Sequence, residues 1–288
     1  MKIIASPRDM QRQIEALRMI GETIGFVPTM GALHEGHLEL VRRARKENSQ
    51  VVVSIFVNPL QFRAGEDFEK YPRIFERDCE LLNNNNCDLV FAPEKAAMVD
   101  DHETTFVEVG KLGESWEGEI RPGHFRGVAT IVAKLFNVVR AHRAYFGEKD
   151  FQQLKIIEAL ARDLNFGIEI VPCETIREND GLALSSRNAY LNIQDRAAAP
   201  TIFQALCAAQ KLASDGESSA QKISEAIQEI IDAAPRLQRE YSVVVDAQTL
   251  EPLETLTHKK PARALIAARA GSTRLIDNAA LNLFLQND

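Results

Sequence analysis

The chain has 288 residues, of which 45% are hydrophobic and 26% are charged, and its 34 Lys and Arg against 41 Asp and Glu give a formal net charge of −7. This length suits a large buried core and two domains. The acidic balance argues against non-specific binding to nucleic acid or to an anionic membrane. No long apolar run opens the sequence, so we expect neither a signal peptide nor a membrane-spanning helix.

Short β-rich segments alternate with longer helical ones over the first part of the chain. Strands are expected at residues 23–28, 51–58, 88–93, 143–147 and 167–172, with helices at 38–46, 75–82, 128–139 and 152–164. Such alternation predicts an α/β fold, a Rossmann-like doubly wound parallel sheet with right-handed crossovers. Ligands of such sheets bind beyond the carboxyl ends of the strands, so the residues that follow each strand are the candidates for function.

The pattern changes near the polar turn at 177–181. Helices are expected at 196–213, with Asn192 as a possible cap, and at 220–234, followed by strands at 241–247, 263–270 and 273–278. We therefore predict two domains, a Rossmann-like domain at 1–176 and a smaller C-terminal α+β domain at 177–288. The four cysteines have no metal-ligand spacing, which indicates reduced thiols in a cytoplasmic protein.

The segment FVPTMGALHEGHLEL, residues 26–40, carries two histidines three residues apart. Gly31 permits a tight turn after the strand, Gly36 permits close approach, and a helix is expected to begin near His37. A helix N-terminus offers unpaired N–H groups to a phosphate, and the His34 and His37 imidazoles at i and i+3 would share one side of the turn. The alternative is a surface turn with one solvated histidine. A zinc site is disfavoured because no third ligand has suitable spacing.

Three further segments follow strands or precede helices and carry polar groups. VNPLQF places the neutral amides of Asn58 and Gln61 after the second strand, and GEKDFQQL places Lys149 and Asp150 after Gly147. LALSSRN, residues 182–188, supplies two hydroxyls and an arginine that could close over phosphates. Taken alone, VNPLQF is better explained by a turn role for Asn58 and a solvated Gln61. An acidic helix start explains GEKDFQQL equally well, and the alternative for LALSSRN is a linker with a helix cap.

RPGHFRG adds Arg121, His124 and Arg126 ahead of an apolar helix, where they could complete an anion-binding rim. The sequence contains neither GxGxxG nor GxxxxGK[ST], so neither the dinucleotide fingerprint nor the P-loop is indicated. Cationic and amide groups that gather at several strand ends imply a nucleotide site of another kind.

The stretches PTMGALHEGH, SIFVNPLQF, RPGHFRG, FGEKDFQQL and DGLALSSRN occur in an order that resembles the pantothenate synthetase family, and RLIDN near the end extends the likeness over almost the whole chain. The HxGH element alone marks the broader superfamily of nucleotidylyl transferases, whereas the five stretches together are specific. The resemblance implies that (R)-pantoate attacks the α-phosphorus of ATP to give pantoyl adenylate and pyrophosphate. The amine of β-alanine then displaces AMP to give pantothenate.

The resemblance also implies roles for single residues. His37 is the expected proton donor, Gln61 and Gln153 are the expected pantoate ligands, and Gln61 also serves β-alanine. Asn58 lies near them and Tyr71 is a candidate gate. The expected ATP site consists of Met30, Gly31, Ala32, Leu33, His34, Glu35, Gly36, His37, Gly147, Glu148, Lys149, Asp150, Ile176, Leu184, Ser185, Ser186 and Arg187.

The same resemblance implies Mg²⁺ that enters with ATP, held mainly by phosphates and water rather than by a protein metal site. It further implies a C-terminal domain that acts as a lid, a homodimer, and no nucleic-acid or membrane partner. Three other interpretations compete with it: a nucleotidyltransferase that adenylates a small cofactor precursor, a nucleotide-binding regulatory module without turnover, and a tRNA synthetase. Gln61 and Gln153 suit a small hydroxy acid better than a phosphorylated acceptor, and the chain is short for an anticodon-binding domain.

Overall fold

The computed structural model describes residues 1–63, 65–66, 68–100 and 102–283. The chain forms two compact units, one of Met1–Glu148 with Gln152–Glu174 and one of Lys149–Phe151 with Thr175–Asp288. The short segment at 149–151 thus belongs with the C-terminal unit although the chain on either side of it belongs with the first. The division after Ile176 and the closing role of the second domain stay predictions.

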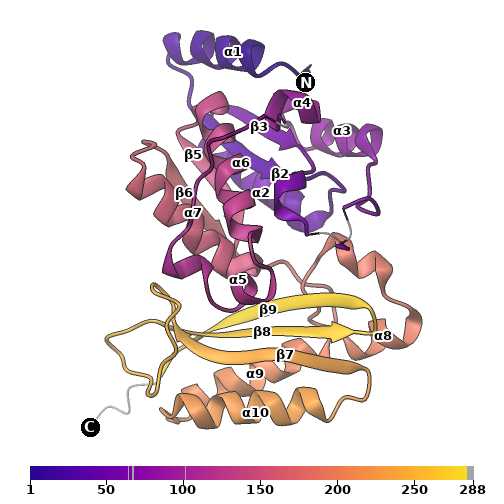
Figure 1. Cartoon of the computed structure of the whole chain (residues 1–288), viewed down its shortest axis with the longest axis vertical. Coiled ribbons are helices and arrows are strands. Elements are labelled where there is room, and N and C mark those ends of the chain that lie inside the picture. Colours follow the sequence, from indigo (N-terminus) through magenta and orange to yellow (C-terminus); the bar gives the residue numbers. More distant parts are fainter. Residues whose placement is uncertain (64, 67, 101, 284–288) are drawn as a thin grey trace. The chain divides into compact units, whose positions relative to one another are not determined.

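The first unit contains a six-stranded parallel sheet in the order β1-β4-β3-β2-β5-β6 (Figure 1). Its strands are β1 (Lys2–Ile4), β2 (Ile24–Thr29), β3 (Gln50–Ile55), β4 (Leu89–Phe91), β5 (Arg143–Gly147) and β6 (Glu169–Cys173). Its helices are α1 (Pro7–Met19), α2 (Glu35–Glu47), α3 (Phe75–Asn84), α4 (Lys95–Met98), α5 (Glu117–Ile120), α6 (His124–Val139) and, from Gln152 onward, α7 (Phe151–Asp163), with 3-10 turns η1 (Pro59–Gln61) and η2 (Lys111–Gly113). The 3-10 turn η3 (Glu148–Asp150) is divided between the two units.

The central strands are buried on both faces. Val27 and Val53 pack with α2 and α3 in one apolar cluster, whereas Phe26 and Val52 point to the opposite face and are also fully buried. This explains why these strands read as nearly continuous apolar runs. β3 and β4 lie on one side of β2, and β5 and β6 lie on the other, so the strand order reverses between β2 and β5. Ligands of open α/β sheets bind at such a reversal.

The second unit is an antiparallel sheet of β7 (Leu237–Asp246), β8 (Ala262–Ala270) and β9 (Thr273–Leu281). Its helices are α8 (Ile193–Ala198), α9 (Thr201–Ser214) and α10 (Ala220–Asp232), with the 3-10 turn η4 (Ser186–Tyr190). α9 and α10 lie along one face of the sheet (Figure 1), and Leu206, Ile227 and Ile266 belong to the apolar cluster between the helices and the strands.

The predicted fold class, a Rossmann-like doubly wound parallel sheet with a smaller C-terminal α+β domain, is confirmed. The sequence analysis missed β1 and α1, so the strand that precedes the histidine loop is the second rather than the first. It also predicted one helix at 196–213, where the structure has α8 and α9 interrupted at Pro200, which has no backbone N–H to donate. Asn192 caps α8 as expected, accepting from the Asp195 N–H at 2.9 Å. No helix among the described residues is long and apolar enough to cross a membrane.

Candidate active site

The loop between β2 and α2 is shaped by left-handed backbone and by one buried carboxylate. Gly31 has φ +81° and Ala32 has φ +51°, and the turn is held at its start by the Gly31 N–H, which donates to Thr29 Oγ1 at 3.1 Å. Asp78 of α3 then accepts from the Ala32 N–H and the Leu33 N–H, both at 2.8 Å. Burial raises the pKa of Asp78 by more than these two hydrogen bonds lower it, so the pKa lies above its ordinary value. Asp78 therefore fixes the backbone directly before the histidines.

His34 and His37 lie together at the N-terminus of α2. The helix begins at Glu35, two residues earlier than expected, so that His34 is the N-cap and His37 is the third helical residue. The ring centroids are 4.0 Å apart at an interplanar angle of 38°. His34 Nδ1 accepts from the Gly36 N–H at 3.2 Å, and His37 Nδ1 accepts from the His34 N–H at 3.4 Å. Since each Nδ1 accepts a backbone N–H, the proton of either ring in its neutral form is on Nε2, which is then a donor.

The turn after β3 places Gln61 against the same loop. Asn58 caps η1 by accepting from the Leu60 N–H at 3.0 Å, and its Nδ2 donates to Gln61 Oε1 at 3.0 Å. Gln61 Nε2 in turn contacts Met30 Sδ at 3.0 Å. The structure therefore brings the predicted pantoate ligand Gln61 to Met30, a residue of the predicted ATP site. Tyr71, the candidate gate, is buried, and its ring lies edge-on to Phe62 at 6.1 Å.

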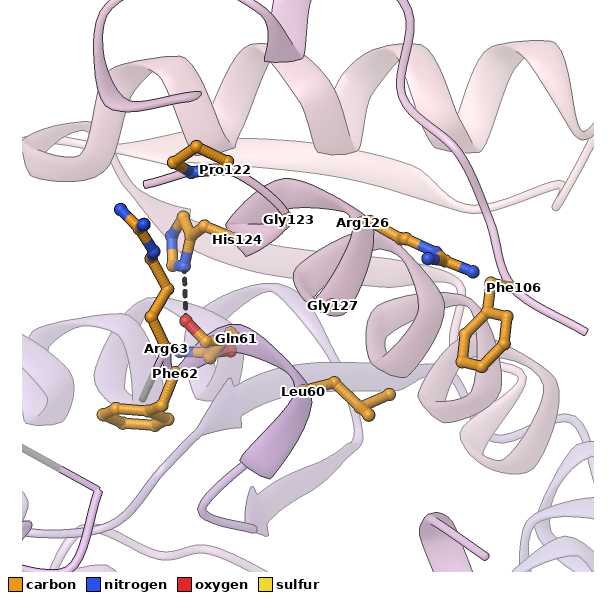
Figure 2. A pocket seen from close by; sticks show the side chains of 10 residues that line it. All are labelled: Leu60, Gln61, Phe62, Arg63, Phe106, Pro122, Gly123, His124, Arg126 and Gly127. Carbon is orange, nitrogen blue, oxygen red and sulfur yellow. Dashed lines mark hydrogen bonds between the residues drawn. The ribbon is translucent and has the colours of Figure 1, made fainter. Parts of the chain in front are cut away.

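Residues of the RPGHFRG segment contact the backbone of this turn. His124 is buried, and its Nδ1 lies 2.8 Å from the Gln61 carbonyl oxygen (Figure 2). Arg121 Nη1 lies 3.1 Å from His124 Nε2. Because Arg121 can only donate, Nε2 accepts and Nδ1–H donates to the carbonyl. Arg121 also donates to the Gln61 carbonyl at 3.2 Å and to both carboxylate oxygens of Glu66, at 3.0 and 2.6 Å.

These contacts set the charges of the segment. Burial and the neighbouring Arg121 guanidinium lower the pKa of His124 to about 4, so the ring is neutral near pH 7. Burial alone would raise the pKa of Glu66, but the Arg121 guanidinium outweighs it and the pKa is lowered. Arg126 pairs with Glu108 at 2.7 Å and stacks over Phe106 at 4.1 Å. The anion-binding rim expected for Arg121, His124 and Arg126 stays a prediction, and in the structure each of the three contacts a protein partner.

A cavity of about 420 Å³ lies beside this turn. Figure 2 shows Arg63 and His124 toward one end of it and Arg126 with Phe106 toward the other. Its lining residues are Leu60, Gln61, Phe62, Arg63, Phe106, Pro122, Gly123, His124, Arg126 and Gly127. The backbone of Gln61 thus borders a cavity, while its side chain reaches Met30.

The segment after β5 is divided between the two units. Gly147 and Glu148 belong to the first unit, whereas Lys149 and Asp150 belong to the second, where the Lys149 Nζ lies 4.0 Å from an Asp150 carboxylate oxygen. In α7 the two glutamines differ. Gln152 is buried and accepts from the Glu117 N–H at 3.1 Å, whereas Gln153, the predicted pantoate ligand, is half-buried.

The hydroxyl-rich segment forms a hairpin in the second unit. Arg177 pairs with Ala183 in an isolated antiparallel bridge, and the Leu184 N–H donates to the Ile176 carbonyl at 2.9 Å. Ser185 caps η4 by accepting from the Arg187 N–H at 3.2 Å. Ile176 and Leu184 therefore lie on paired arms of one hairpin, and Ser185 leads directly into η4.

No group of three or more His, Cys, Asp or Glu in the described part of the chain is placed to hold a metal ion. Sequence reasoning missed the supporting residues Asp78, Asp277 and Asn278. The signals were present, because Asp78 lies four residues before Leu82 on the buried face of an amphipathic helix. Asp277 and Asn278 are a polar pair in the otherwise apolar strand β9, and all three are less than 6% exposed.

An α/β sheet with a histidine pair at a helix N-terminus beside its strand reversal defines a nucleotide-binding enzyme. The family model described as pantoate-beta-alanine ligase matches residues 2–280. Pantothenate synthetase of Rubrobacter xylanophilus is 56% identical over 97% of this chain and 98% of the relative, and that of Thermotoga neapolitana is 50% identical over 98% and 100%.

Solved structures agree with these relatives. Pantothenate synthetase of Thermus thermophilus has a TM-score of 0.92 at 46% identity, covering 98% of this chain and 100% of that one. Pantoate-beta-alanine ligase of Francisella tularensis, complexed with beta-gamma ATP and beta-alanine, has a TM-score of 0.79 at 32% identity over 97% of both chains. The chain belongs to the pantoate–β-alanine ligase family, and it is an ATP-dependent ligase that joins pantoate to β-alanine. This finding decides against the three competing interpretations.

Proposed function

We propose that the chain carries out this ligation in two steps, with the residues described above in defined roles. The carboxylate of (R)-pantoate attacks the α-phosphorus of ATP and pyrophosphate leaves, giving pantoyl adenylate. The amine of β-alanine then attacks the acyl carbon, the bond to AMP breaks, and the amine loses a proton as pantothenate forms. A carboxylate is a poor acyl donor, and the mixed anhydride makes AMP the leaving group.

The observation that carries this proposal is the histidine pair at the N-terminus of α2. Two rings 4.0 Å apart, each with its Nδ1 bonded to backbone, present two Nε2–H groups beside the partial positive charge of a helix end. Donors fixed before the substrate arrives stabilise the negative charge that builds on the phosphates without reorganising. We assign His34 and His37 to the triphosphate, with His37 as the proton donor.

Gln61 and Gln153 are assigned to pantoate, and Gln61 also to β-alanine. A neutral carboxamide donates to a carboxylate and accepts from a hydroxyl, which matches the two kinds of polar group on pantoate. Gln61 suits a role that requires fixed geometry, because Asn58, Met30 and the His124–Arg121 pair hold its side chain and its carbonyl. Substrates held at fixed separation react faster because less orientational freedom is lost in the transition state.

ATP is assigned to the residues that the resemblance implies. They are Met30, Gly31, Ala32, Leu33, His34, Glu35, Gly36, His37, Gly147, Glu148, Lys149, Asp150, Ile176, Leu184, Ser185, Ser186 and Arg187. The solved structure of the Francisella tularensis relative is a complex with beta-gamma ATP and beta-alanine, which supports the assignment of ATP and β-alanine as substrates of this chain. Mg²⁺ enters with ATP in this proposal, because Mg²⁺ keeps most of its waters when it binds nucleotide phosphates.

Two further properties rest on the family resemblance, namely a cytoplasmic location and a homodimer. The four free thiols suit a reducing compartment. Sedimentation equilibrium of the full chain tests the second property, with a mass of about twice the 32.2 kDa chain expected for the homodimer. A monomer at micromolar concentration would contradict it.

The adenylate step is tested by exchange of labelled pyrophosphate into ATP before any β-alanine is added. We expect exchange that requires pantoate and falls at least about 100-fold in His37→Ala, the size of effect of losing one preorganised donor to a developing charge. The matched control is His258→Ala, which removes an exposed histidine of the second unit. Exchange that needs β-alanine, or that proceeds without pantoate, would rule out the proposed order.

A further inference from the structure

Strand β9 carries two adjacent polar residues in an otherwise apolar segment. Asp277 is 5% exposed and Asn278 is 4% exposed. Successive side chains of a strand point to opposite faces of the sheet. Leu275 and Ala279, which share the face of Asp277, belong to the apolar cluster packed against α9 and α10, so Asn278 points to the other face. Two buried polar residues on opposite faces of one strand require separate partners.

Asp277 holds the hairpin that leads to Ser185. Arg177 Nη1 donates to Asp277 Oδ2 at 2.5 Å and Nη2 donates to Oδ1 at 2.9 Å, a bidentate pair. The same guanidinium donates to the Gly181 carbonyl at 3.1 Å and stacks over Phe203 at 4.3 Å. Since Asp277 is buried and both of its oxygens accept from Arg177, this pair holds the first arm of the hairpin to β9.

Asn278 holds the segment that carries Lys149. Its Nδ2 donates to the Lys149 carbonyl at 2.9 Å, and its Oδ1 accepts from Arg263 Nε at 2.6 Å. Because Arg263 can only donate, the amide orientation is settled and the N–H must face Lys149. The Arg263 guanidinium lies over the Phe151 ring at 3.9 Å. These contacts explain why residues 149–151 group with the C-terminal unit.

We propose that Asp277 and Asn278 are positioning residues that bind two phosphate-directed segments to one strand, so that Lys149 and the run Ser185–Arg187 keep a fixed relation to each other. This inference rests on the proposed binding of ATP by those segments. A lysine on a flexible stem loses side-chain and backbone freedom when it grips a phosphate. When Asn278 holds the Lys149 carbonyl beforehand, part of this entropy loss is avoided and ATP binds more tightly. Pantoate binding, which is assigned to the first unit, is not affected.

The contact to Lys149 is tested with two variants of the full chain, Asn278→Asp and Asn278→Leu. Both lose the Nδ2–H donor, but only Asp adds a charge. We expect the dissociation constant of MgATP, measured by calorimetry, to rise about tenfold in both variants, equivalent to about 1.4 kcal/mol for one lost positioning bond. The dissociation constant of pantoate should stay within about twofold.

The matched controls are Gln210→Glu and Gln210→Leu. Like Asn278, Gln210 donates from its side-chain amide to a backbone carbonyl, in this case that of Ala280 in β9, at 3.1 Å. Neither control should change MgATP binding. A loss in Asn278→Asp alone would indicate charge repulsion and overturn the proposal. An equal loss of ATP and pantoate binding would overturn it as well, because it would indicate general loosening of the fold.

Lys149→Ala separates this inference from the proposed function. If Lys149→Ala weakens MgATP binding but the Asn278 variants do not, the positioning role is wrong and the assignment of Lys149 to ATP stands. If Lys149→Ala has no effect, the assignment of Lys149 fails and the inference fails with it.

Asp277→Asn tests the other contact, and we expect hydrogen exchange at 182–187 to become faster than in wild type. Unchanged exchange there would refute the role of Asp277.

Discussion

Among single residues, Asp78 shows how a group remote in sequence shapes the candidate site. Its two oxygens accept from the N–H groups of Ala32 and Leu33, 46 and 45 residues away, in a stretch of left-handed backbone. An added Cβ at Gly31 would lie 3.0 Å from Asp78 Oδ2, so the loop and the carboxylate fit closely. The N-cap geometry of His34 depends on this support.

Asp78→Asn tests the support. An amide can accept from only one of the two N–H groups and turns its own N–H toward the other, which costs about 1–3 kcal/mol for the unsatisfied donor. We expect the unfolding free energy to fall by that amount in urea titrations, and the KM for ATP to rise. Glu76→Gln, an exposed change in the same helix, is the control. Wild-type stability together with a wild-type KM would contradict the role of Asp78.

His124 predicts a pH effect on stability. Its folded pKa of about 4 lies below the ordinary value of 6.5, so the unfolded chain binds the proton first as the pH falls. Stability should therefore be fully present above pH 6.5 and decrease between pH 6.5 and 4, by up to about 3 kcal/mol from this residue.

Urea titrations across this pH range measure the effect, and the wild type minus His124→Gln difference isolates it. His142→Gln is the comparison, because the His142 pKa is lowered by burial of a less enclosed ring. A pH slope that is the same in wild type and His124→Gln would show that His124 is not buried as a neutral ring.

Among the elements, the approach of η1 to α6 determines where Gln61 lies. A Cβ at Gly127 would lie 2.1 Å from the Leu60 carbonyl oxygen and 2.7 Å from the Gln61 N, so only glycine permits this contact. The Asn58 amide bridges the same two elements by donating to the Gly127 carbonyl at 3.1 Å. Gly127 of the RPGHFRG segment therefore sets the position of η1, which carries the proposed pantoate ligand Gln61.

Gly127→Ala should displace η1 from α6. We expect the KM for pantoate to rise at least about tenfold, since misplacement by a fraction of an ångström weakens a positioned contact, and the melting temperature to fall. The control is Gly110→Ala, where an added Cβ meets no atom within 4 Å. A pantoate KM unchanged by Gly127→Ala would show that the position of η1 does not govern Gln61.

For the molecule as a whole, each of the two units has a buried apolar cluster of its own. Ile227 belongs to the cluster beneath β7–β9, and Val53 belongs to the cluster between the parallel sheet and α2. Each is fully buried. Separate cores allow one unit to loosen while the other keeps its protection against hydrogen exchange.

Ile227→Ala and Val53→Ala form a matched pair for this expectation. Truncating a buried Ile costs about 2–5 kcal/mol, and a buried Val somewhat less. We expect Ile227→Ala to speed amide exchange in α9, α10 and β7–β9 and to leave β2, β3 and β5 protected, with the converse for Val53→Ala. Exchange followed by mass spectrometry measures both, and uniform acceleration across the chain would show a single cooperative unit instead.

Much of the architecture follows from local sequence. The apolar runs predict strands β2 to β4 because they reflect burial on both faces, the short runs at β5 and β6 also suffice, and the side-chain chemistry of Asn192 predicts its cap. β1 escapes prediction because its three residues are mostly exposed and carry no periodicity. α1 does have sequence signals, with Ser6 as N-cap and Pro7 in the first turn, and the expected elements should have included it. Pro200 likewise marks the break between α8 and α9.

Local pattern and the order of motifs are sufficient for the fold class, the family and the loops that carry histidine, lysine, serine and amide groups. The positions of these groups depend on contacts that no local pattern encodes. The hydrogen-bond partner of Asp78 lies 46 residues away in the sequence, that of Asp277 lies 100 residues away and that of Asn278 lies 129 residues away. Such pairings arise only when strand order brings distant segments together. For the same reason, nothing in the sequence of RPGHFRG indicates that Arg121 and His124 contact the Gln61 carbonyl in the fold.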